Sequence, residues 1–396
     1  MIDITYDVQS PDGIGGDVHF ELIGNGNPLT IPQDAVTGNL FDVSGSGRIT
    51  IDPTKTPYAA AETMTVRARV TATRALPLYV VYDLTKTPGQ DGQVEYVYSN
   101  DPRLESYGRF DKVWFGVTNG LTYKTTKLVM RRCSAGSVHV GFNGEISSPE
   151  VPPNDGLVTY GEPFYMSVFE LTEGQYSRIV GASASDSDRP KDYISYQQCR
   201  GIKTGSDGSG VDINWPVSGD VVGYENTSSP GTWNKSLCLQ LRDLTGEQTF
   251  DIPTEGQWEY GCRAGTETYF NSGIKRESVT YASEIITELA WMQYYSQWQQ
   301  ERVQKVGLLK PNNWGIYDMH GNVFEMCRDV WSSNYPNGTN PTGPNGNPTS
   351  DRIRRGGNFG CTAVQVTSGS RLSWSATRAD AEGLGVRLVM QFQYPD

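Results

Sequence analysis

The chain has 396 residues and a mass of 43.7 kDa, which is too long for one ordinary hydrophobic core, so two or three domains are expected. Its formal net charge is -12 and it has no Lys- or Arg-rich run, which excludes nucleic acid as an expected partner. No stretch approaches the ~20 apolar residues of a membrane helix, so no membrane insertion is expected. The first residues contain no signal-peptide pattern, so the sequence predicts no signal peptide in this chain.

Residues 1–85 contain four predicted short strands, separated by Gly, Pro and Asp turns. The third is the clearest, because Met64, Val66, Ala68 and Val70 alternate with polar residues, as in a strand with one solvent-exposed face. A small all-β, Ig-like sandwich that holds or presents the next domain is therefore expected over residues 1–85. The four predicted strands are 17–22, 48–51, 64–71 and 78–82.

The segment 86–153 is polar and Gly-rich, and residues 87–92 (TPGQDG) are typical of a linker. Residues 124–132 (KTTKLVMRR) predict an amphipathic strand that enters the next domain. We therefore assign residues 86–153 to a linker with entry strands and residues 154–396 to a further domain.

Two helix starts are predicted in this last domain. Thr172 is followed by Gln175, and Thr254 by Gln257, each at the spacing of a capping box. Beyond residue 266 no helical period is sustained, and long Asn/Gly/Pro segments such as 337–350 predict irregular loops. Short helices and extensive loops are therefore expected, with Trp258, Trp314 and Trp331 as packing residues.

Four separated motifs resemble one family. They are 164–172 (FYMSVFELT), 252–260 (IPTEGQWEY), 313–326 (NWGIYDMHGNVFEM), and 355–359 (RGGNF) followed by 385–388 (GVRL). In this order they resemble the formylglycine-generating enzyme, or sulfatase-modifying factor, family. The resemblance implies an α+β fold of the C-type lectin type, with short helices and irregular loops, after the all-β sandwich.

The enzyme that names the family is a copper-dependent oxidase that converts a substrate cysteine to formylglycine. Its copper is held by two cysteines spaced five apart after the double glycine, and the matching positions here are Cys361 and Val366. Because Val366 cannot ligate a metal, no copper and no catalytic residue are expected; Cys361 would be catalytic only if the chain were an enzyme. The family's iron-dependent sulfoxide-forming branch needs three histidines, and His19, His139 and His320 do not match that arrangement.

The non-catalytic relatives fit the last segment better. Variable proteins of diversity-generating retroelements use this fold to display a changing binding face, and the spacing after the double glycine resembles theirs. The resemblance implies a receptor that binds a protein or glycan on a cell or phage surface, in an extracellular, cell-surface or virion-associated place. The alternative is a formylglycine-generating oxidase or related sulfatase-modifying enzyme. The ligand-binding residues expected on this basis are Gly360, Cys361, Thr362, Val364, Gln365, Ser370, Leu372, Ser373 and Trp374.

The resemblance also implies a structural Ca²⁺ site in the Gly-Asn-x-x-Glu block, formed by Gly321, Asn322, Val323 and Glu325, because oxygen ligands suit this ion. The alternative is that Asn322 and Glu325 only form hydrogen bonds to loop amides. The six cysteines contain no CxxC pair, and whether any of them form disulfides is left open by the sequence.

Overall fold

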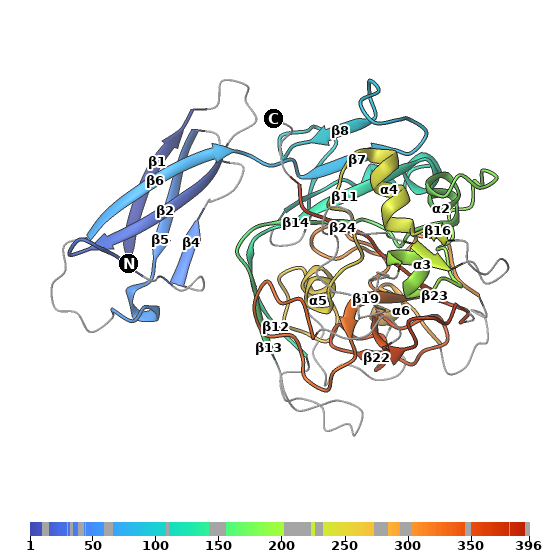
Figure 1. The fold of residues 1–396 in the computed structure, drawn as a ribbon. Helices are drawn as coiled ribbons and strands as arrows, with labels where there is room; N and C mark the ends of the chain where they lie inside the picture. The colour runs from blue at the N-terminus through green and yellow to red at the C-terminus, as the bar shows by residue number, and fades with distance from the viewer. Residues whose placement is uncertain are drawn as a thin grey trace. The chain divides into compact units, whose positions relative to one another are not determined.

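The computed structural model describes residues 1–9, 16–29, 31, 35–38, 43, 45–58, 66–107, 111–141, 156–201, 223–225, 233–272, 284–293, 302–344, 350–379 and 381–392. Two compact units form: residues 1–79 with 96–104, and residues 80–95 with 105–396 (Figure 1). The boundaries of these units differ from the domain boundaries that composition predicted. No helix among the described residues is long and apolar enough to cross a membrane.

The first unit contains two three-stranded antiparallel sheets, in the orders β1-β5-β4 and β3-β2-β6. Val18 and Leu22 from one sheet and Ile49 and Ile51 from the other belong to one buried apolar cluster, so the two sheets pack face to face. The expected all-β sandwich is therefore present. Its elements are β1 (Ile2–Val8), β2 (Gly16–Gly24), β3 (Asn27–Pro28), β4 (Val36–Gly38), β5 (Gly45–Ile51), the 3₁₀ turn η2 (Pro53–Lys55) and β6 (Val66–Arg74).

Strand β6 forms where alternation predicted it, but the expected burial of one face is wrong. Residues 67–71 are all exposed, and the side chain of Val70 is 36% exposed. The described members of the apolar cluster come from the other strands and from loops. Alternation therefore identified the strand, while burial depended on which strands supplied the core.

The second unit is built on a five-stranded sheet in the order β24-β14-β11-β7-β8 (Figure 1). Strands β7 and β14 are nearly continuous apolar runs, buried along their length, as is typical of strands covered on both faces. The sheet places the end of the chain beside the first family motif, since Met166 pairs with Val389. Its strands are β7 (Tyr79–Asp83), β8 (Val94–Val97), β11 (Lys127–Cys133), β14 (Phe164–Ser167) and β24 (Val389–Met390).

The strand predicted over 124–132 begins later than expected. A short helix α1 (Thr122–Thr125) comes first, and β11 starts at Lys127. The hydroxyls of Thr125 and Thr126 donate to the carbonyls of Leu121 and Thr122, which supports the helical turn against the strand preference of threonine.

A four-stranded sheet, β22-β21-β19-β23, carries the later family motifs. It consists of β19 (Phe324–Val330), β21 (Arg352–Arg355), β22 (Arg371–Trp374) and β23 (Leu384–Gly385). The remaining elements are short: η3 (Phe115–Thr118), α6 (Glu284–Thr287), β9 (Glu105–Tyr107), β10 (Asp111–Val113), β12 (Gly136–Val140), β13 (Gly156–Tyr160), β15 (Gly223–Glu225), β16 (Trp233–Lys235), β17 (Ala290–Trp291), β18 (His320–Gly321) and β20 (Gly338–Thr339).

Both predicted capping boxes are confirmed. Thr172 caps α2 (Glu173–Ile179) and Thr254 caps α5 (Glu255–Arg263), each with the reciprocal bond from its glutamine. A third box on α3 (Tyr196–Arg200), and α4 (Leu237–Thr245), were not predicted. The α+β class with short helices is confirmed.

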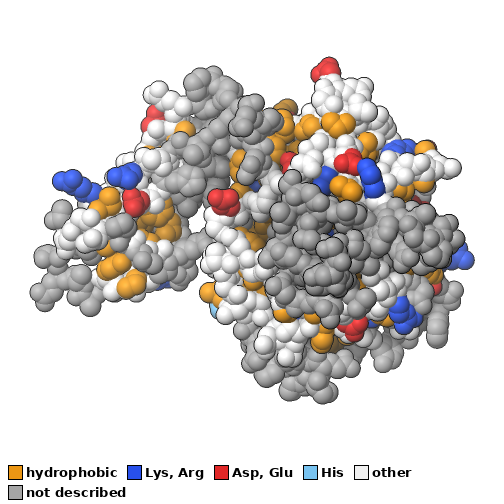
Figure 2. Space-filling model, in the orientation of Figure 1, with side chains coloured by type: hydrophobic (Ala, Val, Ile, Leu, Met, Phe, Trp, Pro, Cys, Tyr) orange, Lys and Arg blue, Asp and Glu red, His pale blue; other side chains and the backbone are white. Residues whose placement is uncertain are grey.

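The surface of the described residues is mixed in charge. On the face drawn in Figure 2, their Lys and Arg side chains lie singly or in small groups between polar and apolar side chains. Trp258 and Trp314 are buried as predicted, but Trp331 is 37% exposed and its ring lies 4.9 Å from the Arg371 guanidinium carbon.

Candidate functional site

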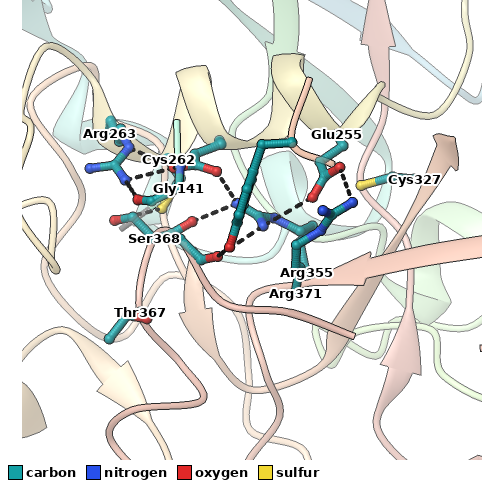
Figure 3. A network of polar contacts seen from close by, with 12 residues as sticks. Gly141, Glu255, Cys262, Arg263, Cys327, Arg355, Thr367, Ser368 and Arg371 are labelled. Atoms are coloured by element: carbon teal, nitrogen blue, oxygen red, sulfur yellow. Dashed lines mark hydrogen bonds and ion pairs between the residues drawn. The ribbon is translucent and has the colours of Figure 1, made fainter. Parts of the chain in front are cut away.

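A buried ionic cluster joins helix α5 to strands β21 and β22. We call it the Arg–Glu frame: Glu255, Glu259, Arg263, Arg355 and Arg371. Arg355 donates to Glu255 at 3.2 Å and to Glu259, while Arg371 donates to Glu255 at 2.7 Å (Figure 3). Arg263 pairs with Glu259 one helical turn away, at 2.6 Å. Every one of these side chains is at most 3% exposed, so each charge depends on its partner for compensation.

The frame holds the turn that leads into β22. Arg355 donates to the carbonyl of Ser368 at 2.7 Å and to that of Gly369 at 3.2 Å. The Tyr335 hydroxyl donates to the same Gly369 carbonyl at 3.1 Å. Burial raises the pKa of Glu255 to about 7, although Arg371 and Arg355 favour its charged form. The backbone that follows the double glycine is therefore fixed from beneath by charge-assisted hydrogen bonds.

A second buried ion pair, Glu325 with Arg387, links the four-stranded sheet to the five-stranded sheet. Glu325 accepts from Arg387 at 2.8 Å and from the indole nitrogen of Trp258 at 2.6 Å. Arg387 also donates to the carbonyls of Ser167 and Tyr317. Residues from all four family motifs thus meet around the Glu325–Arg387 ion pair.

The predicted calcium ligands are occupied by protein partners. The Asn322 side-chain oxygen accepts from the amide of Gln304 at 2.8 Å, and its nitrogen donates to Glu170 at 2.7 Å. Both carboxylate oxygens of Glu325 accept from Arg387. Among the described residues no group of three His, Cys, Asp or Glu side chains is placed to hold a metal. The side-chain oxygens of Asn322 and Glu325 are thus engaged in hydrogen bonds with protein groups, and the Ca²⁺ site of Gly321, Asn322, Val323 and Glu325 stays a prediction of the resemblance.

The predicted ligand-binding residues differ in how open they are. Gly360 and Val364 are exposed, the latter by 38%. Cys361 is buried. The other six are half-buried: Thr362, Gln365, Ser370, Leu372, Ser373 and Trp374. Leu372 and Trp374 lie on one face of β22 and Ser373 on the other, because successive strand residues alternate.

Two of these residues also build the loop that carries them. The Gln365 side-chain oxygen accepts from the amide of Thr362 at 3.0 Å and lies 3.2 Å from the Thr362 hydroxyl. The amide of Gln365 in turn donates to the Thr362 carbonyl at 3.0 Å. Thr362 and Gln365 therefore close a turn, while Gly360 and Val364 project from it.

The cysteine pair expected of the oxidase is reduced to one thiol. Cys361 donates from its sulfur to the Asn358 side-chain oxygen at 3.3 Å, and burial raises the pKa of this thiol. Val366 is 0% exposed, and its methyl group fills the space beside Gly357. A neutral thiol and a buried alkyl group do not form the two-thiolate site that Cu(I) prefers. Arg371, ten residues after Cys361, is paired with Glu255.

A buried histidine near this segment was not predicted to have a role. The Nδ1 of His320 donates to the carbonyl of Val366 at 2.7 Å, and the Cys262 sulfur lies 3.9 Å from Nε2. Burial lowers the pKa of His320 to about 4 and raises that of Cys262, so both are neutral at pH 7. The pair therefore supports the backbone of the segment and does not form an activated thiolate.

Comparisons with known proteins agree with this arrangement. The chain is 25% identical over 248 residues to the chaperone protein LppX of Paenibacillus barcinonensis, covering 59% of this chain and 80% of that protein. It is 28% identical over 120 residues to the formylglycine-generating enzyme of Mus musculus (28% of this chain, 30% of that protein), and 27% identical over 233 residues to that of Bos taurus (50% and 58%). The chain thus matches 30% of the length of the first enzyme and 58% of the length of the second.

Solved structures also resemble the chain. Treponema denticola variable protein 1 superposes with a TM-score of 0.48 at 19% identity, covering 73% of this chain and 99% of that one. PvdO from Pseudomonas aeruginosa superposes with a TM-score of 0.44 at 21% identity, covering 67% and 94%. The family model described as "Sulfatase-modifying factor enzyme 1-like domain" matches residues 123–392, more than half of the chain. The chain therefore belongs to the sulfatase-modifying factor enzyme 1-like domain family.

Proposed function

We propose that this protein is a non-catalytic binding protein, which presents the segment 358–374 as a ligand-binding face. The observation that supports this most is that some residues of the segment are held by the Arg–Glu frame while others are exposed. Ser368 and Arg371 are bonded into the buried Arg–Glu frame, whereas Gly360 and Val364 project to solvent. A fixed backbone with exposed positions is what a binding face requires, because little conformational entropy is lost when a ligand binds.

The same geometry argues against the oxidase. The position of the second copper ligand is Val366, and the thiol of Cys361 is buried, neutral and bonded to Asn358. Family membership alone does not decide between the two functions, since one fold supports different sites. Formylglycine formation remains the competing function because the family includes that enzyme.

The binding proposal is tested by a double variant, Gly360→Ser with Val364→Ser. A Cβ at residue 360 would have its nearest contact at 3.5 Å, from the Asn358 side-chain oxygen, so serine fits there. We expect the variant to keep the melting temperature and to lose ligands that wild type retains on arrays of immobilised glycans and cell-surface proteins. Val366→Ser is the matched control, because it changes a buried residue of the same segment and should destabilise the fold. Equal binding by the double variant and wild type would reject this face.

The retroelement origin is a finer proposal and is tested on the flanking DNA. A retroelement-diversified receptor gene lies beside a reverse transcriptase gene and a near-copy of the stretch coding for residues 358–387, with differences at adenines. The spacing of Ala363 and Arg371 after the double glycine supports this origin, and Val366 departs from it because these proteins usually have a cysteine there. A flanking region with neither feature would reject it without rejecting the binding function.

A further inference from the structure

Strand β21 carries an arginine that has no polar partner among the described residues. Arg354 pairs in register with Leu372 of β22. Its guanidinium carbon lies 4.0 Å from the ring centroid of Phe324 and 4.5 Å from that of Trp374. Its Nε is buried and makes no hydrogen bond, and no ion pair joins the side chain to the part of the chain that the structure describes. The guanidinium therefore lies against two aromatic rings, and its N–H donors have no partner among the described residues.

The charge of Arg354 is not balanced locally. Burial lowers the pKa of Arg354, and among the described groups only the Cys361 thiol opposes this effect, with no carboxylate contributing. The next residue, Arg355, shows the contrast, since two glutamates balance it inside the frame. A partly desolvated cation without a counter-ion costs free energy, and a ligand that brings the counter-charge recovers it.

A second cation lies on the same aromatic ring. The guanidinium carbon of Arg378 is 5.0 Å from the ring of Trp374, and the indole nitrogen of Trp374 lies 3.3 Å from the Arg378 carbonyl, to which it donates. Arg378 is exposed, while Arg354, Leu372 and Trp374 are half-buried. We call these four residues the Arg–Trp patch.

We propose that the Arg–Trp patch binds a carboxylate from an acidic segment of a protein partner, with the planar guanidinium of Arg354 as the main donor. This inference rests on the proposed binding function, to which it adds the ligand chemistry. A planar fork of N–H donors matches a carboxylate in two parallel hydrogen bonds. Arginine and tryptophan are also the residues that concentrate binding energy at protein interfaces, which favours a peptide over an acidic sugar.

The test measures binding of a fluorescein-labelled hexaglutamate peptide to the full chain by anisotropy in 0.15 M salt, a condition that screens distant charges beyond about 8 Å. Hexaglutamine is the neutral control, and a trigalacturonate competitor carries the same carboxylate on a sugar. The variants are Arg354→Met, Arg354→Lys and Arg302→Met, the last as the same loss of charge from an exposed arginine of the same unit. Their melting temperatures verify the fold.

We expect hexaglutamate to bind and Arg354→Met to weaken it about tenfold or more, with Arg302→Met close to wild type. Arg354→Lys should be intermediate, because lysine keeps the charge and loses the planar fork. Equal binding of hexaglutamine, equal loss in Arg302→Met, no binding at all, or an Arg354-dependent preference for trigalacturonate would each overturn the proposal. Formylglycine formation by the chain would refute the proposed function without altering the peptide result, so the two failures are distinguishable.

Discussion

Replacing Glu325 by alanine removes the carboxylate that balances Arg387 inside the second unit. Arg387 donates to Glu325 through Nε and Nη2 at 2.8 to 3.0 Å, and Trp258 donates to the same carboxylate at 2.6 Å. Glu325 is 1% exposed, and Arg387 and Trp258 are 0% exposed. In the variant the guanidinium cannot move to water, because its other donors remain bound to Ser167 and Tyr317.

Removing one partner of a buried ion pair costs about 3–5 kcal/mol, since the other charge stays buried and unpaired. We therefore expect Glu325→Ala to lower the free energy of unfolding of the second unit by about 3–5 kcal/mol. The double variant Glu325→Leu/Arg387→Met should recover most of this loss, because it removes the unpaired charge as well.

The assay is urea unfolding followed by tryptophan fluorescence, performed once with calcium and once with a chelator. If the ion pair with Arg387 explains Glu325, the loss is the same in both buffers. If the residue binds Ca²⁺, wild type is more stable with calcium, and Glu325→Ala abolishes that difference. A loss below about 1 kcal/mol, the value of an exposed pair, would refute the ion-pair reasoning.

Three further predictions concern the segment after the double glycine. Gly357→Ala should lower the free energy of unfolding by about 1–3 kcal/mol, because φ is +73° and a Cβ would lie 2.7 Å from the Val366 methyl group. Gly360→Ala should change it little, because the nearest atom to a Cβ there lies at 3.5 Å. Equal unfolding curves for the two variants would contradict this prediction. Because the pKa of His320 is lowered to about 4, its contribution to stability is complete above about pH 6.5 and is lost as the pH falls toward about 4. His320→Asn should therefore flatten this part of the curve of stability against pH. An unchanged slope would argue against this role of His320. Cys361 should react with iodoacetamide at pH 7 more slowly in the folded than in the unfolded protein, as mass spectrometry of the labelled peptide would show; faster labelling when folded would mean an activated thiol.

Local signals predicted local structure well. The spacing of Thr172 to Gln175 and of Thr254 to Gln257 identified two helix starts, because a capping box needs only residues within one turn. The same spacing from Ser195 to Gln198 was present in the sequence and was missed. Helix α4 was missed although Gly246 follows it in the left-handed conformation of a C-terminal cap.

Contacts between distant residues could not be predicted from one sequence. Arg355 and Glu259 are 96 positions apart, and Arg371 and Glu255 are 116 apart, so nothing local indicates that they pair. The predicted ligand-binding residues lie in the loop after the double glycine and in strand β22. The sequence could not show that Cys361 is buried or that Gln365 closes the turn, since both depend on three-dimensional packing.

We propose that the segment after the double glycine binds a ligand and does not oxidise a substrate cysteine. The most direct measurement incubates the purified chain with Cu(I), oxygen and a sulfatase-type cysteine peptide, with a formylglycine-generating enzyme in parallel, and follows the peptide mass. Because Val366 and the buried Cys361 cannot supply two thiolates, we expect the peptide mass to stay unchanged with this chain and the cysteine to be converted by the enzyme. Conversion of the cysteine to formylglycine by this chain would refute the non-catalytic function.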